Sequence, residues 1–298
     1  MNKDTKKERL MESLDGLSVG DAFGQNFFDA RKIIGGWERE RKLPPGTWRY
    51  TDDTVMAISI AEILLKHDMI LQDELATQFA QSFDPTRGYG ASMYSTLPRI
   101  KKDEDWRALF GSLFGGEGSF GNGAAMRVAP VGAYFATNLD LVIKNATLSA
   151  QVTHHHPEAT AGAIAVAVGA AIAYQTRENP LGADDFIKSI MVHVPEGDVK
   201  NGLREALKCE NMETKTVAKL LGAGHRITVQ DTVPYVIWCA SRYLNDFEEA
   251  LWQTVSGGGD MDTTCAMVGG IVACHVGREE IPNKWISKRE PLPETLSE

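Results

Sequence analysis

The chain has 298 residues, a hydrophobic content of 43%, a formal net charge of −9 and a pI of about 5.4. This length suits one large domain or two small ones, and the acidic balance excludes a chain-wide electrostatic surface for nucleic acid. Any phosphorylated ligand would have to be neutralised locally, by metal ions or by backbone amides.

The cysteine spacing and the N-terminal residues indicate the cellular compartment in which the protein is expected. The four cysteines show no CxxC spacing and no zinc pattern with the seven histidines, so we expect them to be reduced and buried. Residues 1–8 are too polar for a signal peptide. The longest apolar stretch, residues 159–174, is shorter than the ~20 residues that span a bilayer and is expected to be a closely packed helix. We therefore expect a cytoplasmic location and no membrane contact.

Apolar residues at helical spacing predict helices along most of the chain. The first is marked by apolar residues between Leu10 and Val19 and ends near residues 20–24. After a loop rich in glycine, proline and aromatic residues, a second helix starts near Asp53, with Asp52 or Asp53 as its N-cap. Further helical patterns cover residues 71–83, 106–114, 122–134, 139–152, 157–174, 183–192, 201–207, 214–221, 232–243, 246–255 and 260–276.

The order of these elements predicts the fold class. Sustained strand alternation with hairpin turns is missing, and no linker divides the chain. We therefore predict an all-α fold, a compact helical bundle with a single domain over residues 1–298. Its core covers about residues 10–276, and the polar, proline-rich residues 282–298 are expected to form a loosely docked end.

Two acidic clusters lie far apart in the chain, TDDT at residues 51–54 and SGGGDMDTT at residues 256–264. Four carboxylates with neighbouring threonine hydroxyls form an all-oxygen ligand set, which hard cations such as Mg²⁺ or Mn²⁺ prefer. Each cluster stands where a loop turns into an apolar helix. Together they suggest one metal site that the fold closes.

The second cluster has two alternative interpretations. Its residues 260–264 match DxDxT, the nucleophile motif of haloacid-dehalogenase-type phosphatases, but three glycines precede them in place of a hydrophobic strand, and too few residues follow for the α/β domain. Ordinary acidic capping of a helix explains one aspartate but not two, because like charges two residues apart repel each other. A metal ion between them removes that repulsion.

A glycine-rich segment lies before the middle of the chain. Residues 116–121 match GxGxxG, yet no strand precedes them as a dinucleotide fold requires. Residues 118–123 instead open a predicted helix, whose free amides and dipole can hold a phosphate. The alternative is a flexible loop between helices.

Two other segments offer polar groups. Residues 153–157 read THHHP, and three adjacent histidines cannot all face one site, so at most two of them point inward. The alternative to a functional histidine here is one that lies in a loop and contacts solvent. Arg87 and Tyr89 stand in a predicted loop, where a guanidinium and an aromatic ring suit a phosphate or an adenine face.

Six short segments, in this order, make the chain resemble the ADP-ribosylglycohydrolase family, which includes dinitrogenase-reductase-activating glycohydrolase and the ADP-ribosyl-acceptor hydrolases. The resemblance extends from about Leu10 to Val276. The segments are GLSVGDAFG at 16–24, Trp48 with TDDT at 51–54, RGYG at 87–90, GNGAAMR at 121–127, Thr153-His154 with Pro157, and GGDMDTT at 258–264.

The resemblance implies a compact all-α fold with two Mg²⁺ or Mn²⁺ ions in a cleft. The implied metal ligands are Thr51, Asp52, Asp53, Asp260, Asp262 and Thr263. The implied substrate-binding residues are Arg87, Tyr89, His154 and the glycine loop that would hold the diphosphate of ADP-ribose, namely Ser119, Phe120, Gly121, Asn122 and Gly123. Asp52 and Asp53 are the expected catalytic carboxylates, one binding metal while the other handles the water.

The chain departs from the family pattern at two positions. Many members carry a glutamate four residues after the glycine that closes GDAxG, where this chain has Phe28 followed by Asp29. In some relatives that glutamate gates the site and acts as base, so the identity of the base stays open, with Asp29 as a candidate. Met261 replaces a small polar residue between two ligands and is expected to be tolerated.

The expected reaction is hydrolysis of the bond between ribose C1″ of ADP-ribose and an acceptor. The acceptor stays open and could be arginine, serine, another side chain, a small molecule or a nucleic-acid end. We expect the loop 24–45 to determine which acceptor the protein accepts. We expect an ADP-ribosylated protein or small ADP-ribosyl compound as partner, and a monomer. Two alternatives remain: an inert ADP-ribose-binding or structural relative, which Phe28 motivates, and a metal-dependent nucleotide phosphohydrolase.

Overall fold

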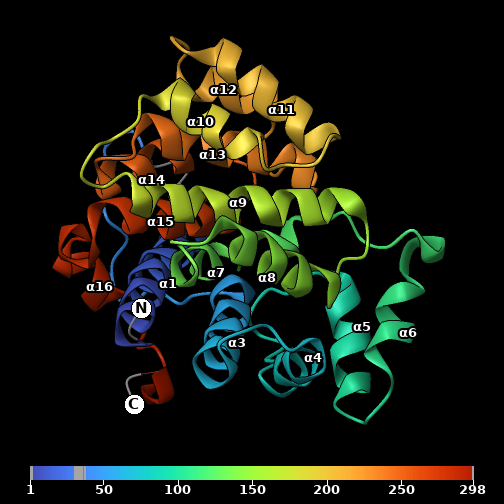
Figure 1. Ribbon diagram of the computed structural model, residues 1–298. Coiled ribbons are helices and arrows are strands. Elements are labelled where there is room, and N and C mark those ends of the chain that lie inside the picture. Colours follow the sequence, from blue (N-terminus) through green and yellow to red (C-terminus); the bar gives the residue numbers. More distant parts are fainter. Residues whose placement is uncertain (1–2, 30–35, 37, 297–298) are drawn as a thin grey trace.

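Every regular element in the described part of the chain is a helix, as predicted. A computed structural model describes residues 3–29, 36 and 38–296 (Figure 1). The first helices are α1 (Lys3–Gln25), α3 (Asp52–His67), α4 (Gln72–Gln81), α5 (Ala91–Ile100), α6 (Trp106–Gly111), α7 (Ala129–Tyr134) and α8 (Leu139–Gln151). The others are α9 (Pro157–Gln175), α10 (Ala183–Met191), α11 (Asp198–Ala206), α12 (Thr214–Leu221), α13 (Val233–Arg242), α14 (Phe247–Ser256), α15 (Met261–Val276) and α16 (Asn283–Lys288).

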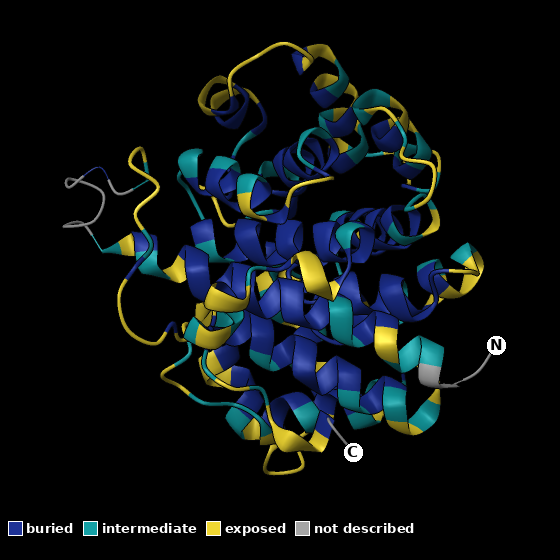
Figure 2. Cartoon of the chain, turned by 90° about the vertical axis from the view of Figure 1, so that its left-hand side faces the viewer, coloured by how far each residue is buried: buried dark blue, intermediate teal, exposed yellow. Residues whose placement is uncertain are grey.

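The core of this single helical domain lies around α9 and α15. Figure 1 shows α9 across the middle of the molecule, with α10, α11 and α12 on one side and α3, α4 and α5 on the other. Nearly all residues of α9 and α15 are buried, and Figure 2 shows the exposed residues on the outer helices and loops. A helix that is apolar on all faces is stable only where neighbours surround it. The small side chains of α9 and α15 let neighbouring helices pack closely around them.

Helix α9 combines unusual length with an apolar composition. By these two criteria it is the one helix in the described residues that is apolar enough to cross a membrane, and 78% of its most apolar window is buried inside the protein. It packs against α7, α8 and α15. The prediction of a closely packed helix is therefore confirmed.

Close contact between α1 and α15 brings two distant parts of the chain together. Three glycines follow one another at intervals of four residues in the second half of α1, and a Cβ atom at any of them would lie 2.1–2.3 Å from a carbonyl oxygen of α15. The antiparallel pairs are Gly16 with Gly269, Gly20 with Cys265 and Gly24 with Met261. Only glycine permits backbones to approach this closely. The contact sets Asp21 of α1 beside the first turn of α15.

The C-terminal residues pack against the body, so the prediction of a loosely docked end is wrong for residues 282–296. Trp285 of α16 is 1% exposed and stacks on Phe23 of α1, with 4.5 Å between ring centroids. The amide of Glu290 donates to the Trp48 carbonyl at 2.9 Å. The polar composition of the tail conceals these anchors, which include a buried ring, main-chain hydrogen bonds and ion pairs of Arg289 and Glu290.

Two regions differ from the predicted helix pattern. Helix α5 is not predicted, because serines, a threonine and Pro98 interrupt its apolar spacing. The sequence predicts one helix over residues 122–134, whereas the structure has a 3₁₀ turn at Asn122–Ala124 and the six-residue α7. Pro130 in the first turn of α7 has no amide proton with which to continue a helix from the preceding residues.

The start of α3 also differs from the prediction. Its N-cap is Thr51, and no side chain caps the helix. Asp52 and Asp53 are therefore the first two helical residues, and their carboxylates are not used for capping. This leaves both carboxylates for contacts outside the helix.

Candidate metal centre and substrate pocket

The two acidic clusters meet at one place in the fold. Asp52 and Asp53 begin α3, and Asp262 lies in the first turn of α15. The Thr263 hydroxyl donates to Asp53 Oδ2 at 3.4 Å across 210 positions of sequence. Carboxylate oxygens of Asp21, Asp53 and Asp262 lie within 4.8 Å of one another. One acidic site is thus closed by segments that are distant in the chain.

Asp21 belongs to this site, although the sequence patterns do not single it out as a ligand. Its carboxylate accepts hydrogen bonds from the amide and hydroxyl of both Thr51 and Thr54, at 2.5–3.1 Å. These bonds fix the first turn of α3 and occupy the Asp21 oxygens. The signal available in the sequence was an aspartate among the small and apolar residues of the segment GLSVGDAFG.

Burial and mutual repulsion oppose ionisation of these carboxyl groups. Asp53 is 1% exposed, and its Oδ1 has no hydrogen-bond partner among the residues that the structure describes. Burial, with repulsion from Asp21, raises the pKa of Asp52 to about 7, and burial raises the pKa of Asp21 to about 6. Burial, with repulsion from Asp21 at Asp53 and from Asp260 at Asp262, raises the pKa values of these two groups well above the usual range. A divalent cation would supply both the opposite charge and the missing partner, so the residues fit such an ion.

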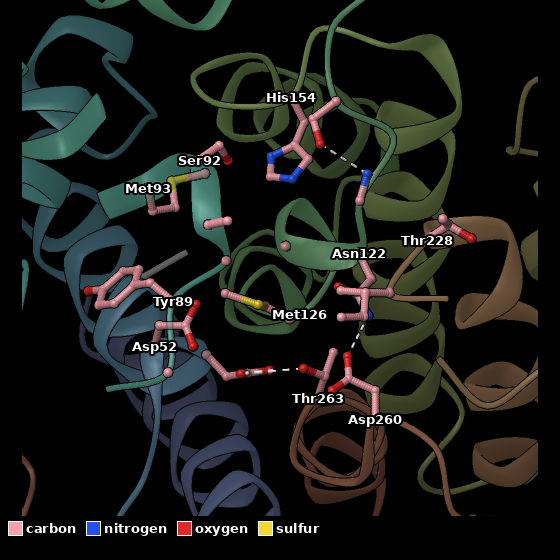
Figure 3. Close-up of a pocket in the computed structure, with 18 of the residues that line it drawn as sticks. Asp52, Tyr89, Ser92, Met93, Asn122, Met126, His154, Thr228, Asp260 and Thr263 are labelled. Carbon is pink, nitrogen blue, oxygen red and sulfur yellow. Dashed lines mark hydrogen bonds between the residues drawn. The ribbon is translucent and has the colours of Figure 1, made fainter. Parts of the chain in front are cut away.

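A cavity of about 540 Å³ adjoins the acidic site (Figure 3). Small-molecule sites usually have ~300–1,000 Å³. Figure 3 shows Asp260 and Thr263 on the side of the cavity opposite to His154, with Asp52 and Tyr89 on a third side. The predicted site residues that line it are Asp52, Asp53, Tyr89, Ser119, Phe120, Gly121, Asn122, Gly123, His154, Asp260, Asp262 and Thr263. Thr51 does not line it, and its hydroxyl contacts Asp21 and Asp53.

The structure does not bring the Arg87 side chain to the cavity. The guanidinium donates to the Tyr50 carbonyl at 2.9 Å and pairs with Glu290. Glu290 Oε1 also accepts from the Tyr50 amide at 2.9 Å, and the Arg87 carbonyl accepts from the Asp52 amide at 2.8 Å. Arg87 therefore connects the C-terminal tail to the segment that carries Asp52.

The glycine loop lines the cavity, but no α-helix begins at its end. The Gly121 amide donates to Ser119 Oγ at 3.1 Å, and the Asn122 amide donates to the Ile227 carbonyl at 3.2 Å. The prediction of a helix terminus with free amides is therefore wrong for these two amides. Asn122 Nδ2 donates to Asp260 Oδ2 at 2.8 Å, which connects the loop to the acidic site.

Of the three adjacent histidines, only His154 lines the cavity. His156 caps α9 instead, since its Nδ1 accepts from the Glu158 amide at 3.1 Å. His154 is 4% exposed. Burial, with the Arg127 charge nearby, lowers the pKa of His154 to about 3, so its ring is neutral at physiological pH. The expectation that at most two of the histidines point inward agrees with this arrangement.

Exposed apolar side chains form another part of the cavity wall. Phe114, Phe120 and Ile227 line it and are 62%, 38% and 62% exposed. Phe114 and Ile227 have φ angles of 54° and 57°, a region that non-glycine residues seldom occupy. Exposed aromatic rings beside a cavity can stack on a heteroaromatic base. Phe114 and Ile227 are not among the predicted residues, because nothing in the local pattern marks them.

The whole chain matches one protein family, since residues 2–298 match the model described as ADP-ribosylglycohydrolase. The chain belongs to the ADP-ribosylglycohydrolase family. It is 31% identical to ADP-ribosylhydrolase ARH3 of Bos taurus, with 96% of this chain and 90% of that protein covered. It is 25% identical to ADP-ribosyl-[dinitrogen reductase] glycohydrolase of Rhodospirillum rubrum, with 94% and 90% covered.

A solved structure described as an ADP-ribosylglycohydrolase-related protein complex has the same fold. It superposes with a TM-score of 0.67 at 22% identity and covers 96% of this chain and 94% of that one. The predicted family and fold class are both confirmed.

The positions that depart from the ADP-ribosylglycohydrolase pattern do not line the cavity. Phe28 is 46% exposed, and neither Phe28 nor Asp29 lines the cavity. Met261 is 7% exposed at the first position of α15. Residues 30–35 and 37, in the loop expected to determine the acceptor, lie outside the described residues.

Proposed function

We propose that the protein hydrolyses the glycosidic bond between C1″ of ADP-ribose and an acceptor, with two divalent cations, Mg²⁺ or Mn²⁺, as cofactors. The observation that carries the proposal is the group of buried carboxylates at the cavity, in which Asp53 Oδ1 has no partner. Membership of the ADP-ribosylglycohydrolase family supports this type of bond. Relatives named as an ADP-ribosylhydrolase and an ADP-ribosyl-[dinitrogen reductase] glycohydrolase support it as well.

The acidic site would hold the ions and the reacting water. Bound ions of this kind orient hydroxyl groups and lower the pKa of a bound water. Asp53 is 1% exposed and linked to two threonines, which suits a ligand. Asp52, which is 9% exposed, is proposed in addition to orient the water and take its proton. The carboxylates stabilise the positive charge that develops at C1″. The proposed ligands are Thr51, Asp52, Asp53, Asp260, Asp262 and Thr263.

The remainder of the cavity suits the rest of the substrate. Residues 119–123 are proposed to hold the diphosphate, and the rings of Phe114 and Phe120 to stack on the adenine base. The buried hydroxyl of Tyr89 has no hydrogen-bond partner in the described part of the chain and is available to a ligand group. We also propose an ADP-ribosylated protein or small ADP-ribosyl compound as partner, a monomer, and a cytoplasmic location, where the four unpaired, buried cysteines would stay reduced.

The test is a panel of defined ADP-ribosyl linkages, including arginine and serine, with Mg²⁺, with Mn²⁺ and with EDTA. We expect free ADP-ribose from at least one linkage and none in EDTA. Release of AMP or phosphate would favour a nucleotide phosphohydrolase. The absence of any product from every linkage would favour an inert ADP-ribose-binding protein.

A further inference from the structure

Arg127 is a fully buried cation without a salt bridge to any carboxylate among the described residues. It lines the cavity, and its guanidinium lies 4.5 Å from the centre of the Phe79 ring. Its Nη2 donates to the Ser149 carbonyl at 3.1 Å and to the Thr153 hydroxyl at 2.8 Å. A buried cation is costly without compensating contacts, and the shorter of these two bonds leads through Thr153 to His154.

The chemistry of Arg127, Thr153 and His154 determines which atom carries each proton in this chain of contacts. A guanidinium only donates, so the Thr153 oxygen accepts from Arg127. That oxygen lies 2.6 Å from His154 Nδ1, and no other acceptor for its proton is found in the described part of the chain. The hydroxyl proton therefore goes to Nδ1, and the ring carries its own proton on Nε2. The opposite tautomer would leave a buried hydroxyl proton without an acceptor, which is costly.

The Nε2 side of the ring faces the cavity (Figure 3). A Cβ atom at Gly121 or Gly123 would lie 3.4 or 3.2 Å from Nε2, so the two glycines leave this edge of the ring open. Within the described residues, Nε2 makes no hydrogen bond of its own. Arg127 and His155 are the charged or titratable neighbours of the ring, and both oppose its protonation; the adjacent glycine loop adds no titratable side chain.

We propose that Arg127 and Thr153 are positioning residues that hold His154 as the Nε2–H tautomer, and that this N–H donates to a phosphate oxygen of ADP-ribose. The identity of the ligand rests on the proposed function, whereas the tautomer does not. Phosphate oxygens only accept, so a fixed donor attracts them, while a ring free to move its proton would present a repelling lone pair part of the time. His154 has no free lone pair in this form and is neither a base nor a metal ligand.

The tautomer can be read from long-range ¹H–¹⁵N NMR spectra of the metal-free protein with ¹⁵N-labelled histidine near pH 7. His154→Phe identifies the His154 signals by their loss. We expect an unprotonated Nδ1 in the parent, a mixture of tautomers in Thr153→Val and recovery of the parent spectrum in Thr153→Ser. Thr176→Val is the matched control, because the Thr176 hydroxyl bonds only to a helix carbonyl.

Calorimetric titration with ADP-ribose tests the ligand half of the proposal on the same proteins. His154→Phe should weaken binding roughly tenfold or more, the usual effect of losing a hydrogen bond to a charged group. Thr153→Val should weaken it about twofold or more, because only part of the population then presents the donor. Thr153→Ser and Thr176→Val should bind as the parent does.

Two results would overturn the proposal: a protonated Nδ1 in the parent, or unchanged tautomer and affinity in Thr153→Val. Binding of ADP-ribose without hydrolysis of any linkage would contradict the proposed function and leave the tautomer and its ligand contact standing. A parent protein that does not bind ADP-ribose would contradict both the function and the contact between His154 and phosphate.

Discussion

Replacing Asp52 by asparagine is expected to make the metal-free protein more stable. The pKa of Asp52 is about 7 in the fold, compared with 3.8 for an ordinary aspartate. At about 1.4 kcal/mol for each pKa unit, keeping this carboxylate ionised costs the fold about 4 kcal/mol above pH 7. An asparagine side chain cannot ionise, so Asp52→Asn should gain up to that amount, or roughly 8 °C in Tm at ~2 °C per kcal/mol for a chain of this size.

The same carboxyl group of Asp52 determines whether stability rises or falls with pH. Between about pH 4 and pH 7 the folded protein keeps a proton at Asp52 that the unfolded chain has lost, so the metal-free parent should lose stability as the pH rises through this range. In Asp52→Asn that loss should be smaller. Thermal unfolding in EDTA from pH 4 to pH 8 measures both effects.

Metal ions should narrow the difference in stability between the two proteins. Mg²⁺ at about 100 times its Kd should stabilise the parent by about 2.7 kcal/mol, and Asp52→Asn, which lacks a proposed ligand, should gain less. Asp103→Asn, at an exposed position, is the control and should change neither value. The proposed electrostatic cost of Asp52 would be refuted if Asp52→Asn were less stable than the parent in EDTA at pH 8. It would also be refuted if Mg²⁺ stabilised both proteins equally.

Three further substitutions test other parts of the site. Asp262→Asn should abolish release of ADP-ribose and weaken Mg²⁺ binding with little change in helical circular dichroism, so hydrolysis at the parent rate would mean that Asp262 is no ligand. Glu290→Ala breaks the contacts with Tyr50 and Arg87 next to the proposed ligands at residues 51–53, and should raise the Kd for Mn²⁺ about tenfold, as measured by electron paramagnetic resonance. Glu104→Ala, which removes an exposed ion pair, is its control, and equal Kd values for the parent and Glu290→Ala would contradict this role. Phe114→Ala should raise KM about tenfold at similar kcat, since base stacking contributes ~1–3 kcal/mol, and an unchanged KM would remove this ring from the site.

The parts of the site that depend on residue chemistry could be predicted from the sequence. Two clusters of acids and hydroxyls, each before an apolar helix, form a pattern typical of a cation site, and the fold brings Asp53 and Thr263 into contact. The helices were predictable for a similar reason, because buried faces repeat at helical spacing. Helix α5 escaped prediction where Pro98 interrupts that spacing.

The parts that depend on packing could not be predicted. Asp21 lies beside the first turn of α15 because glycines let α1 touch α15, and that contact joins residues more than two hundred positions apart. Arg87 looks like a phosphate ligand in its loop, but its partner Glu290 lies in a tail whose composition gives no sign of docking. A close approach of this kind is a property of the tertiary structure and has no local pattern.

The most direct test of the metal centre is a crystal structure of the protein soaked with Mn²⁺, with anomalous diffraction used to locate the ions. We predict two anomalous peaks between the first turns of α3 and α15, within bonding distance of Asp53 and Asp262. Peaks elsewhere on the molecule, or none at this site while hydrolysis persists in EDTA, would contradict the claim that the two acidic clusters form one catalytic metal centre.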